Sequence, residues 1–209
     1  MKQKMTGLFM AISLQKGQRI SLDKDNGQQL TQICLGVNWG VITKGGFFGK
    51  KKVDVDLDAS CITYDNNKKM LETVYFGQLT GQGIKHSGDD RTGDVDGDDG
   101  LDNEVITVTL PSVGKNVDQI VFVLNSFNKQ DFKDIPFASI RLYEGTPDRV
   151  DTIHAVFDIA NDQKFAGSIA MVMGKMYKKE GKWKFAAIGD PTKDQGLEGL
   201  AKTVEGQYL

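Results

Sequence analysis

Aspartate is concentrated in two short segments of this sequence. In residues 53–60, Asp54, Asp56 and Asp58 alternate with apolar residues. Residues 89–104 contain eight acidic residues and a single basic one, Arg91. Like charges at this spacing repel one another, so a folded protein needs a counter-charge close to them. Bound divalent cations are one way to supply it.

The ligand types favour calcium over the other divalent ions. Calcium takes about six to eight oxygen ligands in flexible geometry. Neither segment contains histidine or cysteine, which argues against zinc, copper and iron. Gly88, Gly93, Gly97 and Gly100 let the second segment turn tightly and direct carbonyl oxygens inward. The alternative is a solvated acidic loop without an ion.

The second segment does not follow the EF-hand pattern. Counting from Asp94, aspartates occupy positions 1, 3 and 5, but Asp99 stands where glycine is required and Val105 where the closing glutamate is required. A calcium-binding β-roll would need several glycine-rich copies, and the sequence has one. Any calcium site must therefore combine the two acidic segments in another way.

Other catalytic chemistry has little support. His86 and His154 are isolated, and no nucleophile elbow, P-loop or dinucleotide fingerprint occurs. A metal-dependent hydrolase that uses the acidic cluster is the alternative function, with Arg91 as its one candidate for a positive clamp. Cys34 and Cys61 lack metal-site spacing, and we interpret both as buried thiols in a reducing compartment.

The elements that must position these acids are predicted to be strands. Short β-branched and apolar runs recur between Gly, Asn and Asp turns, which predicts an all-β, mainly antiparallel sandwich in a single domain, residues 1–209. One or two short helices are expected, one of them at residues 196–204. The expected strands are residues 9–14, 19–22, 31–38, 53–63, 72–76, 105–110, 119–126, 138–143, 152–158, 168–177 and 183–188.

A basic segment interrupts this pattern at residues 44–52. It places Phe47 and Phe48 between four lysines, which suits contact with a membrane surface or an acidic partner. The interpretation we favour is a flexible loop whose two phenylalanines fold back onto the sandwich, since isolated apolar residues are common on protein surfaces.

Several short motifs together resemble the TerD family of bacterial tellurite-resistance and stress-response proteins. They occur in order along nearly the whole chain from about residue 12: SLQKG (13–17), LGVNW (35–39), DLDAS (56–60), HSGDDRTG (86–93), DGDD (96–99), IVFV (120–123), IRL (140–142) and GKWKF (181–185).

The resemblance implies a calcium-binding β-sandwich without catalysis, with residues 1–11 as an N-terminal extension. It implies a location in the cytoplasm or at the inner face of the membrane. It also implies partners among other products of tellurite-resistance gene clusters. Peripheral membrane contact, if present, is expected through residues 45–52 because of their lysines and phenylalanines, and no nucleic-acid partner is expected.

Carried over residue by residue, the resemblance assigns metal ligands for two calcium ions. Residues 100–103 look like an insertion relative to the family, so Glu104 is expected to keep the ligand role of the last family acid. The expected ligands are Asp56, Asp58, Asp89, Asp90, Asp94, Asp96, Asp98, Asp99, Asp102 and Glu104.

Overall fold

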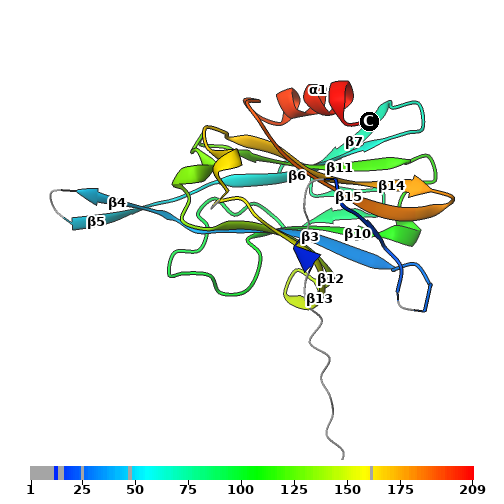
Figure 1. Ribbon diagram of the computed structural model, residues 1–209, viewed down its shortest axis with the longest axis horizontal. Coiled ribbons are helices and arrows are strands. Elements are labelled where there is room, and N and C mark those ends of the chain that lie inside the picture. The colour runs from blue at the N-terminus through cyan, green and yellow to red at the C-terminus, as the bar shows by residue number, and fades with distance from the viewer. Residues whose placement is uncertain (1–11, 14–16, 25, 47–48, 161) are drawn as a thin grey trace, which may run out of the picture.

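Two stacked β-sheets form the body of the protein (Figure 1). The computed structural model describes residues 12–13, 17–24, 26–46, 49–160 and 162–209. The expected N-terminal extension, residues 1–11, lies outside the described residues. The mainly antiparallel β fold that the sequence predicts is confirmed.

The first sheet has seven strands, all antiparallel to their neighbours except β1, which runs parallel to β13. In spatial order its strands are β1 (Ile12–Ser13), β13 (Arg149–Asp158), β12 (Ala138–Thr146), β3 (Gln32–Trp39), β10 (Glu104–Thr109), β9 (Ile84–His86) and β8 (Thr80–Gly81).

The second sheet has six strands and is antiparallel throughout. Its order is β2 (Arg19–Ser21), β15 (Lys182–Thr192), β14 (Ala170–Lys179), β11 (Gln119–Ser126), β6 (Leu57–Tyr64) and β7 (Met70–Val74). Three 3-10 turns connect elements: η1 (Leu110–Ser112), η2 (Phe132–Asp134) and η3 (Gln163–Phe165).

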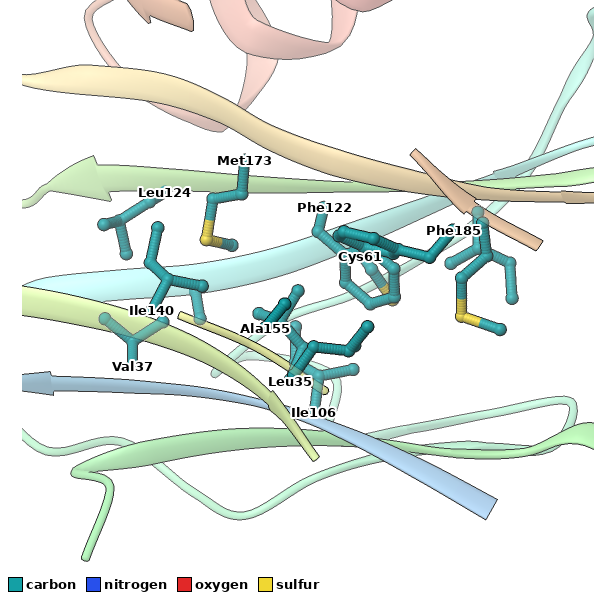
Figure 2. Packing of buried hydrophobic residues seen from close by; sticks show 14 of the residues in the cluster. Leu35, Val37, Cys61, Ile106, Phe122, Leu124, Ile140, Ala155, Met173 and Phe185 are labelled. Atoms are coloured by element: carbon teal, nitrogen blue, oxygen red, sulfur yellow. The ribbon is translucent and has the colours of Figure 1, made fainter. Parts of the chain in front are cut away.

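The main core lies between the sheets, because alternate residues of each strand point inward. Figure 2 shows Leu35, Val37 and Ile140 of one sheet facing Phe122 and Leu124 of the other. Cys34 and Cys61 are both buried free thiols, as predicted.

A second, smaller core lies on the outer face of the six-stranded sheet. Helix α1 (Leu197–Gln207) covers this face (Figure 1) and buries Leu200 and Val204 against Ile62 and Val121. The helix contains the predicted residues 196–204 apart from its N-cap, Gly196. No helix among the described residues is long and apolar enough to cross a membrane.

The basic segment forms a hairpin that projects from the body (Figure 1). Strands β4 (Ile42–Gly46) and β5 (Gly49–Val53) pair only with each other. The described part of the segment is therefore a pair of strands and not the expected loop. Phe47 and Phe48 lie outside the described residues, so their expected folding back onto the sandwich stays a prediction.

The predicted strand 53–63 is also corrected. Only Val53 belongs to β5, residues 54–56 lie between the strands, and β6 begins at Leu57. Val55, Leu57 and Ala59 are fully buried in the core as the alternation predicted, whereas Asp54 is exposed on the connecting segment.

Candidate metal centre

Three predicted ligands, Asp56, Asp58 and Asp89, meet at one end of the sandwich; we call them the strand group. Each offers one carboxylate oxygen, and these atoms lie within 4.8 Å of one another. Asp58 is on β6 of the six-stranded sheet, whereas Asp89 follows β9 of the seven-stranded sheet. The group therefore joins the two sheets, and it forms only when the sandwich closes.

Two of the three members of the strand group are buried, and Asp89 is exposed. Asp56 is 5% exposed and Asp58 is 3% exposed. Asp58 Oδ2 accepts a hydrogen bond of 2.8 Å from Asn125 Nδ2. Among the described residues, nothing hydrogen-bonds to the buried Oδ1 of Asp56. An unpaired buried carboxylate oxygen is costly, so this atom suits a cation as its partner.

The same burial makes these carboxylates hard to ionise without a cation. Desolvation, followed by repulsion from Asp56 and Glu104, raises the pKa of Asp58 to about 7. Desolvation, followed by repulsion from Asp89 and Glu104, raises the pKa of Asp56 to about 6. A divalent cation would oppose both causes, because it replaces lost hydration and offsets the repulsion.

A second set of three predicted ligands, Asp94, Asp98 and Asp99, forms the loop group. Its carboxylate oxygens also lie within 4.8 Å of one another, but Asp98 and Asp99 are exposed. Asn38 Nδ2 donates to Asp98 Oδ1 at 2.9 Å, and Asn103 Nδ2 donates to Asp94 Oδ1 at 3.0 Å. The chain turns here through Gly97 and Gly100, whose φ values are 106° and 87°. L-residues rarely adopt such values, so glycine is required for the turn.

Glu104 lies between the two sheets and ties the acidic loop to β6. It is fully buried, and its Oε2 accepts a 2.8 Å hydrogen bond from the backbone N–H of Ala59. His86 Nε2 lies 3.4 Å from the same oxygen. Burial raises the pKa of Glu104, although the bond to His86 opposes this shift.

Asp90 organises the loop through hydrogen bonds to its carboxylate. Its Oδ1 accepts from the backbone N–H groups of Thr92 at 2.9 Å and Gly93 at 3.0 Å. Its Oδ2 accepts from Asn103 Nδ2 at 3.1 Å. Burial opposes ionisation of Asp90, but these bonds together bring its pKa below the usual value.

Three predicted ligands have Arg or Lys partners. In the strand group, Asp89 Oδ2 lies 3.5 Å from Arg91 Nε. Asp102 Oδ1 lies 2.7 Å from Arg141 Nε in an ion pair that is nearly inaccessible to solvent. Asp96 is almost fully exposed and lies 2.9 Å from Lys52 Nζ of the hairpin. Four predicted ligands therefore lie outside both groups: Asp90, Asp96, Asp102 and Glu104. Their role as ligands stays a prediction.

The sequence reasoning missed the amides that hold these carboxylates. Asn38, Asn103 and Asn125 each donate to a member of one of the groups. Asn125 could have been noticed, because it ends the apolar run of β11 at residues 120–124. Asn38 lies within the LGVNW motif, but nothing local indicates that it donates to Asp98.

The similarity of the whole chain to known proteins decides its family. The TerD domain model matches residues 10–203. This chain belongs to the TerD family. The stress response protein SCP2 of Bacillus subtilis (strain 168) is 35% identical over 204 residues, which covers 91% of this chain and 98% of SCP2. The tellurium resistance protein TerZ of Serratia marcescens is 32% identical over 195 residues, covering 90% and 94% respectively.

The TerD fold is also similar to solved structures. One is described as a homologue of telluride resistance protein (TerD), SCO6318 from Streptomyces coelicolor A3(2). It matches with a TM-score of 0.61 and 16% identity, over 79% of this chain and 92% of that chain. At this identity the likeness concerns the fold of the TerD domain alone.

Proposed function

We propose that this TerD-family protein is a non-enzymatic calcium-binding module that acts in tellurium resistance or a general stress response. The role follows the names of its relatives, a stress response protein and tellurium resistance proteins. The observation that carries the calcium proposal is the strand group, in which three carboxylates converge and a buried Asp56 oxygen has no hydrogen-bond partner among the described residues.

Two calcium ions would fit the two groups, one ion in each. Hard carboxylate oxygens dominate both, and the amide oxygens and backbone carbonyls nearby are further ligands of the kind that calcium takes. The direct test is calorimetric titration of calcium into protein stripped with a chelator. Saturable binding supports the proposal, and an absence of binding up to millimolar calcium contradicts it.

The alternative is a metal-dependent hydrolase that uses the same acids. One observation favours testing it: Arg91 lines the same cavity of about 400 Å³ as Asp56, Asp58 and Asp89. A guanidinium there could neutralise a phosphoester. Turnover of generic phosphoester and ester substrates with magnesium or manganese, lost in Arg91→Ala, would support the hydrolase over the binding module.

The partners we propose are other tellurite-resistance proteins and, through the β4–β5 hairpin, the inner surface of the cytoplasmic membrane. Lys44, Lys50 and Lys51 are exposed on the hairpin, so anionic headgroups could pair with them. Co-sedimentation with vesicles containing anionic lipid tests this proposal. Replacing the three lysines by glutamine should abolish binding. The same change at Lys85, Lys179 and Lys193, which are exposed and lie outside the hairpin, should not.

A further inference from the structure

A cavity lined by aromatic rings adjoins the strand group; we call it the aromatic pocket. Its volume is about 240 Å³, and Tyr75, Phe76 and Phe127 line it. The ring centroids of Tyr75 and Phe76 are 5.3 Å apart, and those of Phe76 and Phe127 are 6.2 Å apart, both in edge-to-face contact. Phe76 is 38% exposed and Phe127 is 58% exposed. Large apolar rings gathered at an open cavity commonly mark a ligand surface.

The pocket lies next to the cavity of the candidate metal centre. Asp58 lines both this pocket and the cavity that contains Asp56 and Asp89. Phe76 and Phe127 also line both cavities. A molecule held against Phe76 and Phe127 would therefore lie beside the carboxylates proposed to hold the cation.

The three carboxylates of the strand group would leave coordination positions of a bound calcium ion unfilled. Calcium takes about six to eight oxygens, and three carboxylates are in place here. One of their oxygens, Asp58 Oδ2, already accepts a hydrogen bond from Asn125. An oxygen donor from outside the chain could occupy the remaining positions.

The pocket also favours an anion with an apolar body. Among the described residues, Lys129 is the one cationic residue that lines it, and Leu197 of helix α1 adds an apolar surface. Asp58, the one acidic residue there, belongs to the strand group whose charge the ion would offset. The volume lies below the roughly 300–1,000 Å³ of pockets for drug-sized ligands. A single aromatic ring on a short chain is therefore an appropriate size.

We propose that the calcium-loaded strand group and the aromatic pocket together bind a small aryl carboxylate. The carboxylate would bind the ion, and the ring would lie against Phe76 and Phe127. A free aromatic acid and a peptide that ends in phenylalanine share this chemistry. The inference rests on the proposed calcium site and extends it to a ligand class.

Ligand-observed NMR tests the proposal with 3-phenylpropionate as the free acid and N-acetyl-glycyl-phenylalanine as the peptide end. Saturation transfer is recorded with millimolar calcium and again with a chelator. We expect transfer to at least one ligand with calcium, a loss of at least tenfold in affinity with chelator, and none to 3-phenylpropanol, which lacks the carboxylate. The probe that binds more tightly shows whether the pocket prefers a free aromatic acid or the C-terminus of a peptide.

Two variants separate the pocket from the ion. Phe76→Ala with Phe127→Ala should weaken ligand binding at least tenfold while calcium affinity stays within about twofold. Leu79→Ala is the matched control, because Leu79 is exposed but does not line the pocket; ligand binding should not change. Circular dichroism checks that the double variant folds.

Three results would overturn the inference and leave the calcium proposal standing: no ligand binding to the calcium-loaded protein, equal binding with chelator, or undiminished binding by the double variant. If calorimetry finds no calcium binding, the proposed function fails and this inference fails with it.

Discussion

The strand group and the loop group each consist of three aspartates, but different parts of the fold position them. Asp56 and Asp58 are buried where the two sheets meet, whereas Asp98 and Asp99 are exposed on a glycine-rich turn. The strand group is therefore positioned by the closing of the core. The loop group is positioned by local turns and by the amides of Asn38 and Asn103.

This difference determines how strongly each group destabilises the metal-free fold. Buried like charges destabilise the metal-free fold, and the raised pKa values of Asp56 and Asp58 reflect that cost. Exposed charges on a loop are hydrated and repel one another less. A cation should therefore affect the stability of the fold mainly through the strand group and the order of the loop mainly through the loop group.

The largest expected effect is on stability. Calcium should bind the native state and bind the unfolded chain poorly, because the strand group needs both sheets. Stabilisation is about 2.7 kcal/mol at a hundredfold excess over Kd, or a rise of roughly 5–10 °C in Tm. Thermal unfolding with chelator and with millimolar calcium measures it. Superimposed curves would mean that calcium is not part of the native structure.

The next effect is a pH dependence of the metal-free protein. Asp58 keeps its proton up to about pH 7 when folded, but loses it near pH 3.8 when unfolded. Between these values the folded state binds more protons than the unfolded chain, so the free energy of unfolding falls as pH rises. Urea unfolding of stripped protein from pH 4 to pH 8 measures this fall.

Asp58→Asn should remove much of that pH dependence, since it deletes the titrating group. Asp96→Asn is the matched control for the loss of one charge, because Asp96 is almost fully exposed. If both variants show the pH profile of the parent, the strand group does not cause it.

A smaller effect distinguishes the two groups as calcium sites. Asp56→Ala with Asp58→Ala should weaken calcium binding at least tenfold, about 1.4 kcal/mol or more. Asp98→Ala with Asp99→Ala should cost less, because these residues are more exposed and hydrated. Competition with a chromophoric chelator gives both affinities. An equal loss of calcium affinity in the two double variants would mean that the strand group and the loop group do not differ as calcium sites.

The smallest effect on calcium is expected at Asp102. Asp102 lies outside both groups and its Oδ1 is paired with Arg141, although its Oδ2 has no hydrogen-bond partner among the described residues. We expect Asp102→Ala to leave calcium affinity within about twofold. The variant should nevertheless lose about 1–3 kcal/mol of stability, because Arg141 loses a charged hydrogen-bond acceptor. Urea unfolding and the chelator competition give the two numbers. A tenfold loss of calcium affinity in this variant would instead indicate that Asp102 is a calcium ligand.

Much of the fold could be predicted because its signals are local. The alternation of Val55, Leu57 and Ala59 indicated the buried face of the segment that leads into β6, and Leu200 and Val204 indicated the buried face of α1. The β4–β5 hairpin could not be found this way. Lysine and glycine dominate it, and without a core to face it carries no apolar alternation.

The candidate site was only partly predictable for a related reason. Composition identified the acids, but it could not sort them into groups, because sorting depends on contacts between distant residues. Asp102 and Arg141 are 39 positions apart, and Asp58 and Asn125 are 67 apart. Nothing local to Asp102 distinguishes it from Asp98 or Asp99, and only the closed sandwich does so.

The most direct test of the central claim is calorimetric titration of chelator-stripped protein with calcium and, separately, with magnesium. Flexible carboxylates in both groups suit calcium, whereas magnesium requires strict octahedral geometry and gives up its water reluctantly. We predict saturable calcium binding that is at least tenfold tighter than magnesium binding. Equal affinity for the two ions, or no calcium binding, would contradict the assignment of these acidic groups as a calcium centre.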